Sequence, residues 1–191
     1  KKYFYPGTPA SNGTTRNSLL FRDPTVDGLK TGHTAAAGYC LVATAKRDLP
    51  NVGSRRLISI VLGAASENAR ANESQKLLNW GYAAFDSVKL FDAEQAVATP
   101  EVWKGKAGTV KIGRTTPIVV TVPAGSGGKL STEVVRQDPL IAPFTKGQAM
   151  GTLKVKLGAD TVAEVPLVAL EGVEQAGFFG RAWDAIRLWI K

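Results

Sequence analysis

The sequence predicts an α+β fold in which an antiparallel sheet with one helix is followed by a small all-β domain and a C-terminal amphipathic helix. Three observations lead to this prediction. Two apolar, β-prone runs at 38–45 and 56–64 precede a stretch with helical spacing at 67–85. Short β-like runs separated by Gly and Pro recur from residue 87, and helical periodicity returns at 175–191.

Length and composition narrow the classes of protein. The chain has 191 residues, of which 44% are hydrophobic and 21% charged, a balance typical of one or two globular domains and not of disordered, collagen-like or coiled-coil proteins. A single Cys and a single His exclude a disulfide framework within the chain and a Cys/His zinc site. Cys40 lies in an apolar run and is expected to be buried and unreactive.

The net charge of +8 permits nucleic acid, an anionic membrane or an acidic small substrate as partner. The positive excess is concentrated in residues 1–86 and 177–191. The sequence contains no run of five like charges and no basic stripe with interleaved aromatics, so nucleic-acid binding is not expected.

The first part of the chain is expected to hold three strands and one helix. Ser66 can cap the helix, and Glu67 lies in its first turn, where the helix dipole favours an acid. The two runs before the helix are joined by a polar turn, as in a hairpin. In order, we expect a loop at 1–18, a short apolar piece at 19–21, strands at 26–34, 38–45 and 56–64, a turn at 47–53, and the helix at 67–85.

The second part is expected to form a small all-β sandwich or barrel, because its β-like runs are short and closely spaced. These runs are Ser87–Phe91, Gln95–Ala98, Gly108–Ile112, Ile118–Pro123, Lys129–Val135, Ala149–Leu157 and Thr161–Leu170. The predicted domains are therefore residues 1–86, 87–174 and 175–191.

The tail at 175–191 combines an aromatic-rich apolar side with basic residues, as in helices that lie in a membrane interface. An alternative is a terminal helix packed on its own domain. In the first interpretation the membrane-facing residues are Phe178, Phe179, Trp183, Ile186, Trp189 and Ile190.

The most informative stretch contains Lys30, Thr31 and Gly32. Lys-Thr-Gly is the third signature of the penicillin-recognising serine enzymes. A glycine lets a substrate lie against the strand, a threonine hydroxyl can bind a carboxylate, and a lysine supplies positive charge beside a nucleophile. The tripeptide alone also fits an ordinary strand that tolerates a glycine.

The context of the tripeptide strengthens the functional interpretation. Residues 27–34 (Asp-Gly-Leu-Lys-Thr-Gly-His-Thr) and 37–39 (Ala-Gly-Tyr) closely resemble the D-alanyl-D-alanine carboxypeptidases of the penicillin-binding protein 5 type. The resemblance covers nearly the whole chain, most specifically 16–81. It implies that 1–86 is part of a β-lactamase/transpeptidase-like domain. Further matching segments are Arg16–Leu20, Arg55–Ala64, Lys76–Gly81, Trp103, Pro166–Val168 and the tail.

The resemblance also implies residue roles. Lys30 and Thr31 take the Lys-Thr-Gly roles, and the backbone N–H of His33 matches the position that completes the oxyanion hole. Arg16 and Arg70 match two arginines near the terminal carboxylate of the substrate. On residue type alone, Arg70 would be a solvated helix residue, and both interpretations stay open. The His33 imidazole is expected to be a spacer or a hydrogen-bonding group.

Two motifs that this family needs, S-x-x-K with the nucleophilic serine and S-x-N, are expected before Lys30, and neither is found there. Ser126–Lys129 fits S-x-x-K literally, but two glycines make it a poor helix start. Ser66–Asn68 fits S-x-N but serves as a helix cap. We therefore expect the nucleophile to lie outside this chain, in a complementary N-terminal fragment. Without that fragment, the strand at 56–64 and the helix at 67–85 would expose apolar surface, so a folded sample is expected to contain the fragment or to self-associate.

The expected function is that of the C-terminal portion of a carboxypeptidase that trims terminal D-Ala from peptidoglycan pentapeptides through an acyl-enzyme and binds β-lactam antibiotics. The resemblance places it on the periplasmic face of the bacterial inner membrane. A β-lactamase of the same fold class is disfavoured by the β domain and the tail. A non-catalytic peptidoglycan- or partner-binding module remains the alternative, and the β domain is either a spacer or a partner-binding unit.

Overall fold

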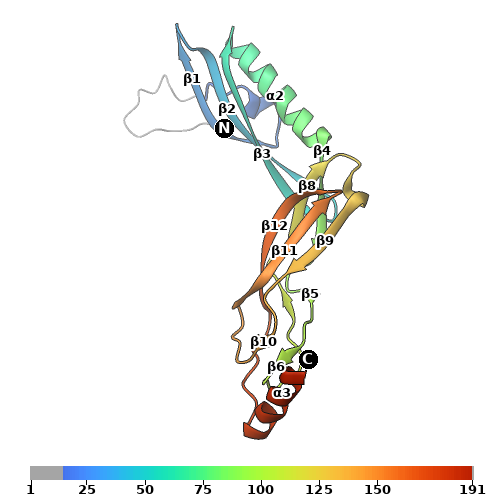
Figure 1. Cartoon of the computed structure of the whole chain (residues 1–191). Coiled ribbons are helices and arrows are strands. Elements are labelled where there is room, and N and C mark those ends of the chain that lie inside the picture. Colours follow the sequence, from blue (N-terminus) through green and yellow to red (C-terminus); the bar gives the residue numbers. More distant parts are fainter. Residues whose placement is uncertain (1–14, 191) are drawn as a thin grey trace, which may run out of the picture. The chain divides into compact units, whose positions relative to one another are not determined.

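The structure, a computed structural model, describes residues 15–190 without the side chains of Phe179, Ile186, Leu188 and Ile190. The chain divides into two compact units, Lys1–Ser87 and Val88–Lys191, one residue from the expected boundary at 86/87. The first fourteen residues of the expected N-terminal loop lie outside the described part. The elements in chain order are α1 (Leu19–Arg22), β1 (Val26–Thr34), β2 (Gly38–Leu49), β3 (Gly53–Ala64), α2 (Glu67–Ala84), β4 (Phe85–Phe91), β5 (Ala96–Ala98), β6 (Val102–Trp103), β7 (Ile112–Gly113), β8 (Ile118–Pro123), β9 (Leu130–Val135), β10 (Leu140–Ile141), β11 (Ala149–Leu157), β12 (Asp160–Ala169) and α3 (Phe178–Ile190) (Figure 1).

The first unit is an antiparallel sheet in the order β1-β2-β3 with α2 packed on it (Figure 1). Alternation along β2 brings one set of side chains into a core shared with α1 and α2. That core consists of Leu19, Leu20, Val26, Leu41, Ala43, Ala45 and Leu78. The expected α+β class is confirmed, with a mainly antiparallel sheet and few helices.

Helix α2 begins where the sequence predicts. The Ser66 hydroxyl accepts a hydrogen bond from the Ala69 N–H at 3.0 Å, which satisfies one of the free donors of the first turn. At the other end, the Arg55 guanidinium donates to the carbonyls of Gly81, Tyr82 and Phe85. Both ends of α2 are therefore held by side chains.

The face of the sheet that carries Ile58, Ile60 and Leu62 is open. These three β3 side chains are 62%, 61% and 72% exposed, as expected of an apolar strand whose second face lacks a cover within the described residues. Cys40 is half-buried rather than buried, and its thiol contacts the Ala37 and Gly38 carbonyls. The difference arises because only one face of the sheet is covered within the described residues.

The hairpin of β2 and β3 is longer than expected. The predicted turn at 47–53 contains paired strand residues, because Arg47 lies opposite Arg55 and Leu49 lies opposite Gly53. Only residues 50–52 remain outside the strands, with Asn51 at a φ of 62°.

The second unit is built on a five-stranded sheet in the order β5-β7-β12-β11-β9. The strand β8, paired with β4, adds its alternate side chains to the same core, as in a sandwich. Buried members of this core include Ile118, Val120 and Val122 of β8 and Leu153 and Val155 of β11.

Two differences from the predicted strands occur in this unit. The run at 108–112 forms a strand only at Ile112–Gly113, because Gly108 and Val110 bond the main chain of Val102 and Pro100. The short strands β6 and β10, which pair in parallel, were not predicted.

The tail forms the helix α3, which contacts the second unit through polar groups. The Asp184 carboxylate accepts a hydrogen bond from the Lys104 N–H at 2.6 Å, and the Arg187 guanidinium lies 5.3 Å from the centre of the Trp103 ring. Within residues 15–190, no helix has both the length and the apolar character needed to cross a bilayer.

Candidate functional site

The Lys-Thr-Gly stretch lies on β1, an edge strand of the three-stranded sheet. Lys30, Thr31 and Gly32 are paired with Val42, Leu41 and Cys40 of β2. Since β2 occupies one side of β1, the other edge has no strand partner within the described residues. The motif is thus presented where an extended ligand could approach.

The side chains of this stretch differ in environment. The Lys30 ammonium is exposed and donates to the Thr31 carbonyl at 2.8 Å, while Thr31 itself is half-buried. Gly32 is exposed and does not adopt a positive φ. A Cβ added at Gly32 would lie 3.8 Å from the Cys40 Cβ, an ordinary contact. The packing of the described chain therefore does not require a glycine at this position.

The His33 imidazole stacks on a neighbouring ring. Its centroid is 4.0 Å from that of Tyr39, its partner on β2, with the planes inclined by 32°. This contact fits the expected spacer role of the side chain and leaves the His33 N–H as the group to which the resemblance assigns chemistry.

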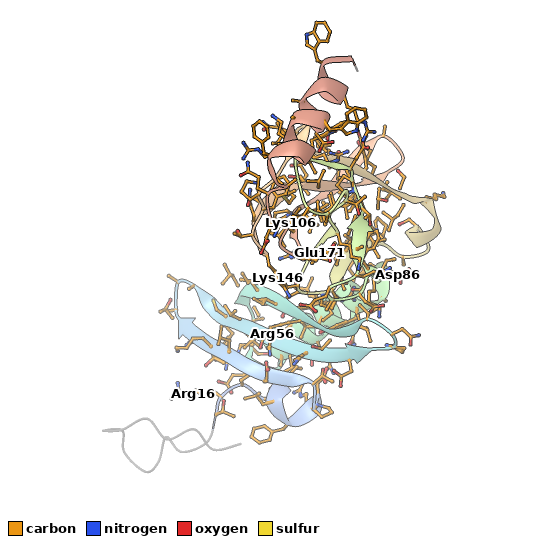
Figure 2. All side chains as sticks on the ribbon, turned by 90° about the horizontal axis from the view of Figure 1, so that it is seen from below. Arg16, Arg56, Asp86, Lys106, Lys146 and Glu171 are labelled. Carbon is orange, nitrogen blue, oxygen red and sulfur yellow. The ribbon has the colours of Figure 1, made fainter. Side chains whose placement is uncertain are left out.

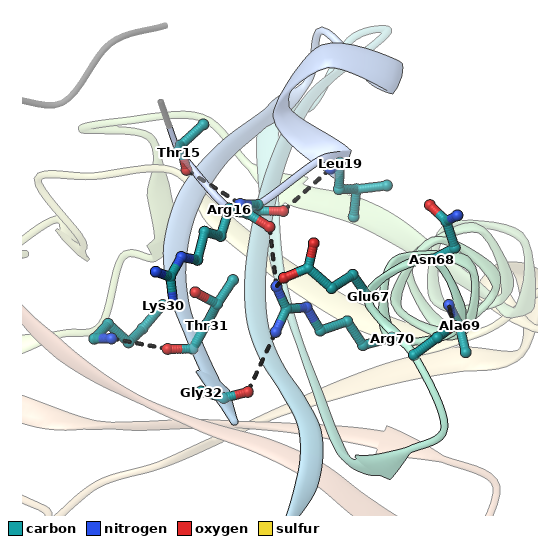
Figure 3. Close-up of polar contacts among 12 residues, drawn as sticks. Thr15, Arg16, Leu19, Lys30, Thr31, Gly32, Glu67, Asn68, Ala69 and Arg70 are labelled. Carbon is teal, nitrogen blue, oxygen red and sulfur yellow. Dashed lines mark hydrogen bonds and ion pairs between the residues drawn. The ribbon is translucent and has the colours of Figure 1, made fainter. Parts of the chain in front are cut away.

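Arg70 is the buried arginine of this site. It is 2% exposed, so the interpretation as a solvated helix residue is wrong. Its guanidinium donates to the carbonyl of Gly32 at 3.2 Å and to the carbonyl of Arg16 at 3.1 Å (Figure 3). It also pairs with Glu67 at 3.1 Å. All of these partners belong to the chain itself.

The segment before α1 brings Arg16 to β1. The buried Asn17 amide donates to the Gly28 carbonyl at 3.1 Å, and its oxygen accepts from the Leu19 N–H at 3.2 Å. The Arg16 side chain is exposed and extends toward the Lys30–Thr31 stretch (Figure 3). Two cationic groups and a threonine hydroxyl therefore gather along β1, an arrangement suited to binding a carboxylate.

An ion pair ties β1 across the sheet. Both Asp27 oxygens accept from the Arg56 guanidinium at 2.7 Å, and the Thr44 hydroxyl also bonds Asp27. Figure 2 shows Arg56 on the three-stranded sheet. The hydrogen bonds from Arg56, followed by that from Thr44, hold the pKa of Asp27 well below its usual range. Asp27 is thus a fixed anion that anchors the strand three residues before Lys30.

Other candidate groups lie elsewhere. Ser126 precedes a short 3-10 turn at Gly127–Lys129 and bonds the Pro123 carbonyl, and Ser66 caps α2. No group of three or more His, Cys, Asp and Glu side chains in residues 15–190 is arranged to hold a metal ion. The described part of the site thus offers cations and hydrogen-bond donors. Ser66 and Ser126, the serines of the two literal motif matches, bond main-chain groups near them in sequence.

Sequence reasoning missed Asn17, Asp27 and Arg56 as positioning residues. An Asn just before a short apolar piece is a turn signal that could have identified Asn17. Asp27 and Arg56 are ordinary polar strand residues, and only the register across three strands shows that they meet.

On α3 the described aromatic side chains are exposed: Phe178 by 73%, Trp183 by 64% and Trp189 by 88%. The expectations for Phe179, Ile186 and Ile190 concern side chains outside the described set.

Comparison with known proteins agrees with this geometry. Residues 5–66 match the family model of D-alanyl-D-alanine carboxypeptidase, and residues 85–175 match that of the penicillin-binding protein 5 C-terminal domain. The chain is 41% identical to D-alanyl-D-alanine carboxypeptidase DacC of Escherichia coli over 175 residues, which cover 91% of this chain and 42% of that protein. It is 37% identical to DacA of the same organism with the same coverage.

A solved structure has the same fold. Penicillin-binding protein 5 from Haemophilus influenzae matches with a TM-score of 0.72 and 35% identity, over 84% of this chain and 46% of that one. The chain spans less than half the length of these relatives. With both family models matched and the fold shared, the chain belongs to the low-molecular-mass penicillin-binding proteins of the D-alanyl-D-alanine carboxypeptidase family.

Proposed function

We propose that this chain is part of a serine-type carboxypeptidase that removes the terminal D-Ala from peptidoglycan pentapeptides and is acylated by penicillin. The observation that carries the proposal is the Lys30–Gly32 stretch on an edge strand, with an exposed glycine that internal packing does not require. A glycine that the packing of the chain does not require is expected where the backbone of a ligand must come close to the strand. The names of the relatives support the same activity.

In this proposal, Thr31 and the Arg16 guanidinium bind the carboxylate of the terminal D-Ala. The Lys30 ammonium supplies positive charge and assists proton transfer beside the nucleophile. The His33 N–H donates to the oxyanion that develops on the scissile carbonyl. A β-lactam places its own carboxylate and carbonyl in the same positions.

We propose that the serine nucleophile is supplied by chain outside these 191 residues. Its oxygen attacks the carbonyl of the D-Ala-D-Ala bond, and the tetrahedral intermediate collapses with loss of D-Ala as the amine. Water then attacks the acyl ester and returns the free serine and the shortened peptide. The reaction needs no metal and no cofactor.

The same missing portion is proposed to cover the open sheet face. Ile58, Ile60 and Leu62 expose a row of large aliphatic side chains on β3. Such a row usually marks a surface that is covered by another segment. We expect this chain expressed alone to self-associate, and the longer protein not to do so; a well-ordered monomer of this chain in ultracentrifugation contradicts the proposal.

The membrane is the proposed partner of α3, through its exposed aromatics and basic residues. The proposed membrane-facing residues are Phe178, Phe179, Trp183, Ile186, Trp189 and Ile190. We propose that the protein works on the periplasmic face of the inner membrane, with residues 87–174 as a domain between the catalytic part and the helix.

Labelled penicillin tests the central proposal. The longer protein is expected to form a stable covalent adduct and to release D-Ala from a pentapeptide, whereas residues 1–191 alone are expected to form none. An adduct on this chain alone contradicts the placement of the nucleophile. If the longer protein forms no adduct and releases no D-Ala, the proposed activity is wrong, and the result is the one expected of a non-catalytic wall-binding module.

A further inference from the structure

Arg70 has an environment that few arginines share. It lies in the first turns of α2. With 2% of its surface exposed, it is the largest of the fully buried side chains among the described residues. A buried guanidinium is costly unless its donors are bonded and its charge is balanced. The groups that meet this requirement therefore show what Arg70 holds together.

Within the described residues Arg70 has three hydrogen-bond acceptors, and two of them are main-chain carbonyls from different segments. One belongs to Gly32 on β1, at 3.2 Å, and the other to Arg16, at 3.1 Å. The third acceptor is the Glu67 carboxylate, at 3.1 Å, and the Tyr39 ring lies 5.6 Å from the guanidinium carbon. The planar guanidinium thus joins α2, β1 and the segment before α1 (Figure 3).

The bond to Gly32 has a consequence for the next residue. The carbonyl of Gly32 and the N–H of His33 belong to one peptide group, which is planar. A hydrogen bond that fixes the direction of this C=O therefore also fixes the direction of the N–H. β1 is an edge strand with glycines at 28 and 32, and its pairing with β2 constrains this peptide group from one side of the strand only.

We propose that Arg70 is a positioning residue that orients the His33 N–H through the Gly32 carbonyl and holds Arg16 beside the same strand. This inference rests on the proposed function, in which the His33 N–H is an oxyanion donor. It differs from direct binding of the substrate carboxylate by Arg70, because the guanidinium is buried and bonded to the chain's own groups.

The test uses the longer protein with Arg70→Gln and Arg70→Lys. Lys76→Gln is the matched control, because Lys76 is on the same helix, pairs with Glu73 and makes no hydrogen bond or ion pair with β1 within residues 15–190. Stopped-flow acylation by labelled penicillin separates the acylation rate constant from the dissociation constant of the non-covalent complex. Selectivity is measured with peptides that end in D-Ala carboxylate or in its amide.

We expect Arg70→Gln to lower the acylation rate constant by about 10²-fold, the loss typical of removing one oxyanion donor, with the dissociation constant changed less than about threefold. Arg70→Lys is expected to retain part of the rate, since a single ammonium can reach one of the two carbonyls. Unchanged acylation overturns the proposal. Weaker non-covalent binding together with lost preference for the carboxylate also overturns it and assigns direct ligation instead.

A second measurement does not depend on catalysis. In this chain, Arg70→Lys is expected to speed hydrogen exchange of the His33 amide by at least about tenfold relative to Lys76→Gln, while the amides of the second unit are unchanged. Equal exchange at His33 in both variants overturns the proposal. If the wild-type longer protein is not acylated but the exchange result holds, the proposed function fails and the positioning of the peptide group stands.

Discussion

Replacing Gly32 by Ala separates a glycine needed by a ligand from one needed by the fold. The added Cβ would lie 3.8 Å from the Cys40 Cβ, and Gly32 does not have a positive φ. The folded state thus accepts the methyl group, and the unfolded chain loses freedom. We expect the free energy of unfolding to change by no more than about 1 kcal/mol, with stabilisation of about 0.4–1 kcal/mol the central expectation.

The matched comparison is Gly38→Ala at the first residue of β2. Gly38 has a φ of +63°, and a Cβ there would lie 3.0 Å from the Gly63 Cα and 3.1 Å from the Ala64 carbonyl oxygen. Both the backbone conformation and the contacts oppose a side chain. The left-handed conformation alone costs about 1–2 kcal/mol, so this variant is expected to lose at least that much.

For penicillin acylation we expect the opposite ranking, with Gly32→Ala losing more activity than Gly38→Ala. A substrate lying against β1 meets the new methyl group at Gly32, and a displacement of about 1 Å can lower a rate by about 10²-fold. Urea unfolding of both variants and penicillin acylation of the longer protein measure the two effects. Wild-type acylation by Gly32→Ala refutes the close approach of a ligand, and unfolding of that variant refutes the steric argument.

Three further variants test other contacts. Arg56 lowers the pKa of Asp27, so the pair stabilises the fold above the ordinary carboxyl pKa, and this stabilisation is lost as the pH falls through the lowered pKa. Arg56→Gln should therefore melt at a lower temperature than wild type at pH 7, and the difference in melting temperature should shrink below about pH 4. Trp183→Ser and Trp189→Ser should each weaken binding to phosphatidylglycerol vesicles by at least about tenfold in sedimentation, and binding should fall in high salt; unchanged binding refutes the membrane-facing assignment. Leu153→Ala, at a fully buried position, should lower the free energy of unfolding of the second unit by about 2–5 kcal/mol in urea, whereas a loss below 1 kcal/mol contradicts its place in the core.

Local chemistry explains what could be predicted from the sequence. The cap at Ser66, the helix that follows and the alternating strand at 149–157 depend on neighbouring residues and were predicted closely. The burial of Arg70 could not be predicted this way, because its acceptor on Arg16 is 54 positions away and an arginine on a helix is usually solvated. The strands β6 and β10 are two residues long and have no periodicity to detect.

Arg56 and Arg70 explain how the main chain of the edge strand β1 can be held in place although one of its edges is unpaired within the described residues. A strand between two neighbours is fixed by hydrogen bonds on both edges, but a strand that receives an extended ligand must leave one edge unpaired. In β1 the missing constraint is supplied by two arginines: Arg56 holds Asp27 before the Lys-Thr-Gly stretch, and Arg70 holds the Gly32 carbonyl at its end. Because neither arginine is part of a strand that pairs with β1, both ends of the stretch are fixed while its outer edge stays available. Loss of either arginine should therefore loosen the outer edge of β1 more than it changes the pairing of β2 with β3.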